Sequence, residues 1–144
     1  MSAHDLVSGH VTTTKAPRRG LAPALWVFRV AVTIQFIQLA MQPILAGMFL
    51  NGQYSALSTH SSSGGILMVT GFLQIGAAVL LWRPGRIAGW PIGAAVALLV
   101  AELVQLTAGH SRAMALHLPL GVALVIASLL LTGWAWRKRV GSPS

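Results

Sequence analysis

The sequence contains no cysteine and almost no acid. Without cysteine, the chain cannot form a disulfide, a thiolate nucleophile or a cysteine metal site. Asp5 and Glu102 are the only acidic residues among 144, and charged residues make up only 8% of the chain. An ordinary soluble domain carries roughly 25% charged residues, so this chain cannot build a water-exposed surface. Soluble enzymes, disordered chains and secreted disulfide scaffolds are therefore excluded as interpretations of the composition.

Apolar residues make up 55% of the chain instead. A bilayer core of about 30 Å needs roughly 20 helical residues to cross it. Four apolar stretches are long enough to cross, at about residues 24–50, 64–82, 87–108 and 116–136. We therefore predict an all-α protein, an integral membrane four-helix bundle with one transmembrane domain over residues 24–136.

Polar segments separate and flank the four stretches. We expect residues 1–23 to form a disordered cytoplasmic segment and residues 137–144 to form a basic cytoplasmic tail. The run Arg83-Pro84-Gly85-Arg86 predicts a tight turn. Residues 51–63 are rich in Ser, Gly and Asn and predict a loop, and residues 110–115 predict a shorter one. The first apolar stretch is too long for a signal-peptide core, so we expect it to be retained.

Basic residues predict the orientation. If four helices cross the membrane, eight basic residues fall on the side of the two termini: Lys15, Arg18, Arg19, Arg83, Arg86, Arg137, Lys138 and Arg139. Only Arg112 falls on the other side, and Arg29 can snorkel toward the terminal side. The positive-inside rule then places both termini in the cytoplasm and the protein in the plasma membrane. Because the basic segments lack interleaved stacking aromatics, we expect a lipid bilayer and no nucleic acid as partner. Tryptophans near the span ends are typical of an interfacial belt: Trp26, Trp82, Trp90, Trp134 and Trp136.

The second and fourth stretches repeat one pattern at an offset of 57 residues. The matching pairs are Ala56 with Ala113, His60 with His117, Gly64 with Gly121, Gly71 with Ser128, and Ala78 with Ala135. Residues four and seven apart share one helical face, so each histidine lies above a row of small side chains. The pattern therefore predicts two tandem helical hairpins.

Paired histidines above glycines suit a flat macrocycle held between helices. Imidazole is the commonest metal ligand. His60 and His117 would bind a haem iron from opposite faces, while Gly64 and Gly121 would make room for the porphyrin. In the plainer alternative, the glycines only let helices pack closely, and the histidines are polar loop residues at the interface.

His110 competes with this pair for a ligand position. It lies on the same side, seven residues before His117. Pro119 favours a fourth helix that starts at His117 and leaves His110 in the loop, although a proline kink inside a longer helix is the alternative. A zinc or copper site made by His60, His110 and His117 is also open.

Glu102 is the only acidic residue inside a span, and intramembrane ionisable groups are often functional. Gln105 lies on its face, while Gln35, Gln38 and Gln42 form a polar stripe on the first span. Such a stripe should turn inward and find hydrogen-bond partners. Glu102 is either a protonated structural residue bonded to a glutamine, or a proton-handling or quinol-contacting residue.

The pattern resembles four-helix b-type cytochrome modules and is similar to one half of haem A synthase, in which the second and fourth helices each carry a histidine. It also resembles small four-helix bacterial membrane proteins. There, a Leu-Ala-Gly motif, here Leu45-Ala46-Gly47, precedes the first histidine, and the second stands before a proline, here His117-Leu118-Pro119. The resemblance covers about residues 24–136 and implies His60 and His117 as haem ligands. Because haem A synthase uses two such halves, its activity is not carried over.

These observations favour a bis-histidine b-type haem protein in electron transfer or in redox or haem sensing. Arg112 could pair with a haem propionate, and quinol or a redox protein would be the partner. The alternative is a cofactor-free accessory subunit or small transporter, and a homo-oligomer or larger membrane complex is compatible with both. No nucleophile, phosphate loop or acid–base set is visible, so no enzymatic activity is assigned.

Overall fold

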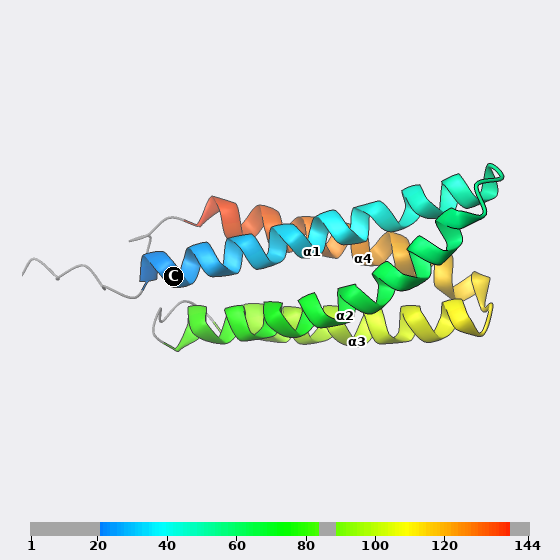
Figure 1. Cartoon of the computed structure of the whole chain (residues 1–144). Helices are drawn as coiled ribbons and strands as arrows, with labels where there is room; N and C mark the ends of the chain where they lie inside the picture. Colours follow the sequence, from blue (N-terminus) through cyan, green and yellow to red (C-terminus); the bar gives the residue numbers. More distant parts are fainter. Residues whose placement is uncertain (1–20, 84–88, 139–144) are drawn as a thin grey trace, which may run out of the picture.

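Four long helices run antiparallel along one another. The computed structural model describes residues 21–83 and 89–138. The helices are α1 (Leu21–Leu50), α2 (Ser55–Trp82), α3 (Trp90–His110) and α4 (Met114–Arg137). Figure 1 shows the chain passing up and down the bundle twice, which confirms the predicted all-α four-helix fold. Most of the expected N-terminal segment, the turn around Pro84-Gly85 and the end of the basic tail lie outside the described residues.

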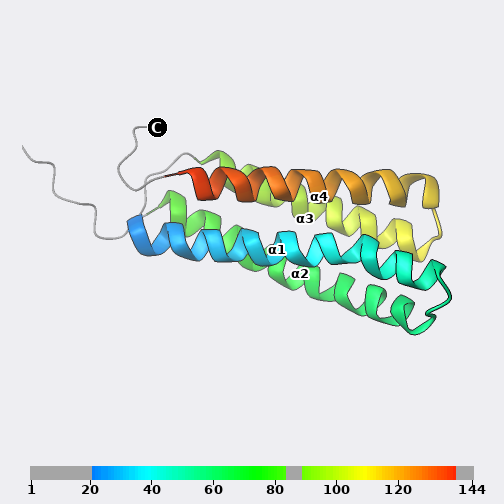
Figure 2. The same cartoon turned by 90° about the horizontal axis from the view of Figure 1, so that it is seen from above.

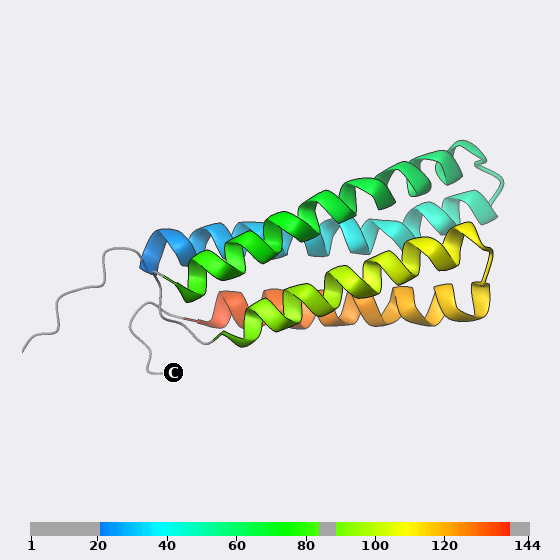
Figure 3. The ribbon, with the colours of Figure 1, turned by 90° about the horizontal axis from the view of Figure 1, so that it is seen from below.

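The helices form a ring of neighbours. α1 packs on α2, α2 on α3, α3 on α4, and α4 back on α1. Within the described ranges, the diagonal pairs α1 with α3 and α2 with α4 make no backbone contact. The two hairpins, α1–α2 and α3–α4, diverge toward their short turns (Figures 2 and 3). The ends of the hairpins far from the termini are therefore further apart than the ends near them.

The first two helices begin earlier than hydropathy predicts. α1 starts at Leu21, inside the segment expected to be disordered. α2 starts at Ser55, so the loop expected over residues 51–63 is wrong beyond Tyr54. The extra turns of α2 are stabilised by serine hydroxyls that donate to carbonyls four residues back, such as Ser62 to Ser58 at 2.9 Å.

The last helix also begins before the expected residue. α4 starts at Met114 and contains Pro119, so the longer helix with an internal proline fits and the start at His117 does not. His110 is correspondingly the last residue of α3, not a loop residue. The α3–α4 turn is therefore shorter than the loop expected over residues 110–115.

The outer surface is rich in large apolar residues, while the interior combines polar side chains with apolar ones such as Phe28 and Leu81. Five polar residues are buried between the helices: Gln35, Gln74, Glu102, Ser128 and Thr132. Long apolar side chains such as Phe72, Leu73 and Leu130 are more than 60% exposed. A lipid environment, unlike water, favours large apolar side chains on the outer surface and leaves polar side chains to bond between the helices. All four helices are long and apolar enough to cross a bilayer, and the chain is a multi-pass membrane protein.

The bundle end nearest the termini is rich in aromatic residues. The five tryptophans lie at the start of α1 and α3 or at the end of α2 and α4. The guanidinium of Arg29 lies 5.2 Å from the ring centres of both Trp26 and Trp136. Arg29 also donates to the carbonyls of Ala135 and Lys138 at the end of α4. Arg29 therefore joins the start of α1 to the end of α4, beyond the snorkelling expected of it.

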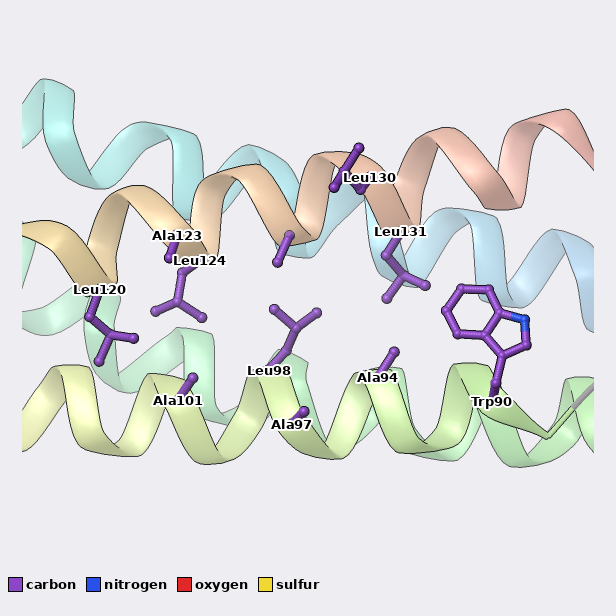
Figure 4. Close-up of a pocket in the computed structure, with 11 residues that line it drawn as sticks. Trp90, Ala94, Ala97, Leu98, Ala101, Leu120, Ala123, Leu124, Leu130 and Leu131 are labelled. Atoms are coloured by element: carbon purple, nitrogen blue, oxygen red, sulfur yellow. The ribbon is translucent and has the colours of Figure 1, made fainter.

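An apolar groove of about 410 Å³ runs between α3 and α4. Figure 4 shows the small side chains of Ala94, Ala97 and Ala101 facing Ala123 across it. The groove has no histidine, glutamine or acid in its lining. It is therefore separate from the polar residues that the sequence singles out.

Candidate functional site

His60 and His117 face one another across the diagonal of the bundle. His60 lies in the second turn of α2, and His117 is the fourth residue of α4. Both side chains are half-buried, and their ring centres are 6.1 Å apart with the planes inclined at 68°. Since the backbones of α2 and α4 do not touch, these two side chains span the diagonal. The two histidines are helical residues that point inward, and the alternative that they are loop residues is wrong.

Each imidazole is held by a main-chain carbonyl of the neighbouring helix. His60 Nδ1 lies 3.2 Å from the Gln42 carbonyl of α1, and His117 Nδ1 lies 3.0 Å from the Gln105 carbonyl of α3. A carbonyl oxygen only accepts, so Nδ1 must carry the hydrogen in both rings. The other nitrogen, Nε2, is then left with its lone pair in both. A metal-binding histidine typically has this arrangement.

Gly109 provides the space in which the His117 ring lies. A methyl group at position 109 would lie 3.0 Å from His117 Cε1 and 3.2 Å from Nδ1. Gly109 is one helical turn beyond Gln105, so its missing side chain opens the approach to the Gln105 carbonyl. The repeat of the second and fourth stretches does not point to this residue. The sequence feature that could have identified Gly109 is an Ala-Gly pair near the end of α3, which matches Ala46-Gly47 near the end of α1.

The glycines beneath the histidines face side chains of α3. A methyl group at position 64 would lie 3.5 Å from Leu106 Cδ1, which is an ordinary contact. At Gly121 a methyl group would lie only 2.8 Å from Gln105 Nε2. The space that each glycine leaves is therefore taken by an α3 side chain, Leu106 or Gln105.

The other polar residues expected at this end of the bundle lie apart from the pair. His110 is exposed, and its Nδ1 bonds to the carbonyl of Leu106 in its own helix at 2.9 Å. Among residues 21–83 and 89–138 no group of three or more histidines and acids could hold a metal ion. The three-histidine zinc or copper site is therefore wrong. Arg112 lies in the α3–α4 turn, exposed and with φ of 58°.

Three glutamines of α1 form hydrogen bonds to other helices of the bundle. The Gln35 amide donates to Glu102 Oε1 of α3, and both residues are buried, at 1% and 5% exposure. Gln38 accepts from Thr70 at 2.7 Å, and Gln42 donates to Ser63 at 2.8 Å. The predicted inward stripe is confirmed, and Glu102 bonds to a glutamine across the bundle. That glutamine is Gln35, whereas Gln105 packs against Gly121 instead.

The pair fits axial ligation of a metal that brings its own equatorial ligands. Two neighbouring imidazoles whose Nε2 atoms keep their lone pairs could supply two ligands, and a porphyrin would supply the remaining four. No protein-family model, no curated protein and no solved structure matches the chain. The function is therefore inferred from the geometry of these residues.

Proposed function

We propose that the protein is a b-type haem protein of the plasma membrane, with His60 and His117 as axial ligands and a role in electron transfer or redox sensing. The observation that carries this proposal is the facing pair of half-buried imidazoles, each with Nδ1 bound to a carbonyl. One residue comes from each hairpin, at the end where the hairpins diverge (Figure 3).

The spacing of the two rings supports ligation by one metal ion. Imidazole nitrogen binds a metal at about 2 Å, so two rings on opposite sides of one ion have centres about 6 Å apart. The observed separation of the ring centres is 6.1 Å. Two histidine ligands leave no open position on haem iron, which favours electron transfer over oxygen chemistry.

The protein residues supply position and polarity. The Gln42 and Gln105 carbonyls fix the tautomer and the rotation of each ring. Gly121 and the Gln105 side chain that lies beside it would be among the residues lining the haem site. Arg112 lies in the turn five residues before His117, where its guanidinium would pair with a propionate. Bound haem would supply a one-electron carrier.

We place both termini in the cytoplasm. The described basic residues Arg29, Arg83, Arg137 and Lys138 lie at the terminal end, and the positive-inside rule assigns the basic end to the cytoplasmic side. The histidines then lie near the outer face. Quinol or an outer-side redox protein would be the electron partner.

Visible absorption of the protein purified in mild detergent tests the proposal. We expect a sharp Soret band and, after reduction, the split visible bands of low-spin haem. His60→Ala and His117→Ala should each abolish or convert this spectrum. His110→Ala is the matched control, because His110 is exposed and bonds within its own helix, and it should leave the spectrum unchanged.

Two outcomes would overturn the proposal. The first is a preparation that stays colourless after haem is supplied, which would favour the cofactor-free accessory subunit. The second is a low-spin spectrum that persists in the His60→Ala, His117→Ala double variant, which would assign the ligands elsewhere.

A further inference from the structure

Three buried side-chain oxygen atoms of the described residues lack a hydrogen-bond partner, namely Gln35 Oε1, Glu102 Oε2 and Gln105 Oε1. The first two belong to residues that contact each other. The same two side chains are already joined by the bond from Gln35 Nε2 to Glu102 Oε1. A carboxylic acid and an amide can form a ring of two hydrogen bonds, and the unpartnered atoms of Glu102 and Gln35 are the ones that the second bond would join.

We propose that Glu102 and Gln35 form a proton-binding acid–amide pair, in which Glu102 Oε2 carries a proton and donates it to Gln35 Oε1. With the proton present, both oxygens gain a partner. Without it, both oxygens are buried acceptors that have no donor. Buried polar atoms in proteins are almost always hydrogen-bonded, which favours the protonated pair.

The groups that face Glu102 supply no compensating cation. Gln35 of α1 bonds to it, Gly71 of α2 lies beside its Oε2, and Leu99 of its own helix lies next to Gly71. Across the described part of the chain, Glu102 has Gln35 as its hydrogen-bond partner and forms no ion pair. Arg29, on the same helix as Gln35, is bound to α4 carbonyls at the terminal end. An ionised carboxylate in this place would be buried and unpaired, which proteins rarely tolerate.

Gly71 shapes the place where the proton is held. A methyl group at position 71 would lie 3.1 Å from Glu102 Oε2 and 2.8 Å from Leu99 Cδ1. The absent side chain therefore lets the carboxyl group lie against α2. The Gln35 amide is also held from this helix, since Nε2 lies 3.4 Å from the Leu67 carbonyl.

The pair places a proton-binding site within the membrane-spanning part of the bundle. Gln105 lies one helical turn from Glu102 on α3, and its carbonyl holds His117. Intramembrane carboxyl groups are the usual members of proton relays. The proton-binding role does not depend on haem, so it stands or falls separately from the proposed function.

Infrared spectroscopy of the full chain in detergent at pH 7 tests this inference. Because Asp5 and Glu102 are the only acidic side chains, the carbonyl stretch of a protonated carboxylic acid is unusually simple to assign. We expect this band in the wild type and in Asp5→Asn, with a shift in deuterium oxide, and its loss in Glu102→Gln. Absence of the band in the wild type, or its persistence in Glu102→Gln, would overturn the inference.

Two further variants test the partner. Gln35→Leu should shift the acid band to higher frequency, because the carboxyl group loses its bonds to the amide. Gly71→Ala should shift the band or remove it, whereas Gly76→Ala should not, since a methyl group at position 76 of the same helix meets no atom within 4 Å. An unshifted band in Gln35→Leu would exclude the pair. If Glu102→Gln fails to fold, the Asp5→Asn variant tests the inference, because Glu102 is its only acidic side chain. Presence of the acid band in that variant would support the protonated pair, and its absence would overturn it.

Discussion

Gly109 determines where the His117 ring lies, because glycine has no side chain to displace it. A larger residue there would push the His117 ring off the Gln105 carbonyl, because even a methyl group would lie 3.0 Å from the ring. We predict that Gly109→Val lowers haem affinity by at least tenfold and broadens the low-spin spectrum. Haem titration followed by absorption measures this.

Gly47→Val is the matched control for that substitution. Gly47 occupies the comparable place near the end of α1, and a methyl group there meets nothing within 4 Å. Equal haem affinity of the two variants would show that Gly109 does not position the ring. The nitrogen chemical shifts of the His117 ring give a second readout without haem, since they report which nitrogen carries the hydrogen.

Arg112 adopts a backbone conformation that a non-glycine residue rarely uses. Its φ of 58° lies in the left-handed region, which costs about 1–2 kcal/mol for a residue with a side chain. Arg112→Gly should therefore leave the stability of the fold unchanged or raise it by up to about 1 kcal/mol. Denaturant unfolding in detergent checks this part.

The same variant should weaken haem binding, because it removes the proposed propionate partner. Arg112→Lys keeps the positive charge and should retain most of the affinity at low salt. If Arg112→Gly binds haem as tightly as the wild type, the propionate role is wrong and the backbone conformation has another cause.

At the scale of the helix, Arg29 connects α1 to the end of α4. Its guanidinium donates to two of the last carbonyls of α4, and a positive charge at a helix C-terminus is also favourable. We predict that Arg29→Met destabilises the bundle by about 1.5–3 kcal/mol, the range of hydrogen bonds made by charged groups.

Thermal unfolding in detergent measures the effect, with Arg137→Met as the control. Arg137 is exposed at the end of α4 and makes no side-chain hydrogen bond among the described residues. Its loss should change stability by less than about 0.5 kcal/mol. Equal destabilisation by the two variants would mean that Arg29 acts only through its positive charge and not through its hydrogen bonds to the end of α4.

Hydropathy predicts the number and order of the helices but not where they begin. The apolar stretch of the second span starts near Gly64, while α2 starts at Ser55. Hydropathy reports which residues prefer lipid, and a helix can continue into the interface if its polar side chains are satisfied. Ser62 and Ser63 achieve this by donating to carbonyls of their own helix. Pro119 is the sixth residue of α4, so it removes the donor that would bond to the Ala115 carbonyl. Prolines inside membrane-spanning helices are tolerated because neighbouring groups can satisfy the freed carbonyl.

The sequence predicts how far along each helix a site residue lies. It does not predict how each helix is rotated about its own axis, and that rotation decides which side chains meet. The repeat pairs His60 with His117, and the structure brings these two side chains together at one end of the bundle. Which glutamine meets Glu102 depends on how α1 and α3 turn toward each other, so the sequence could not single out Gln35 from its stripe. The space that Gly109 provides depends on the same rotation.

At the scale of the whole molecule, the two ends of the bundle differ in chemistry. The terminal end holds the tryptophans and most of the described basic residues, while the other end holds the facing histidines. The hairpins are held together at the terminal end by contacts such as the bond from Trp136 to Thr33 at 3.1 Å. They diverge toward the short turns at the other end (Figure 2).

This polarity leads to a prediction for the orientation in the membrane. The chain has no cysteine, so one introduced cysteine is the only site for a membrane-impermeant thiol reagent. Four crossings place Ser61, near the start of α2, on the side opposite the chain ends. Because the positive-inside rule puts the basic end in the cytoplasm, Ser61→Cys should be labelled in intact cells. Ser142→Cys should be labelled only after the membrane is opened.

Labelling of both before opening would mean that the number of crossings is odd or that one helix lies on the surface. Labelling of Ser142→Cys alone would reverse the orientation and place the histidine pair on the cytoplasmic side.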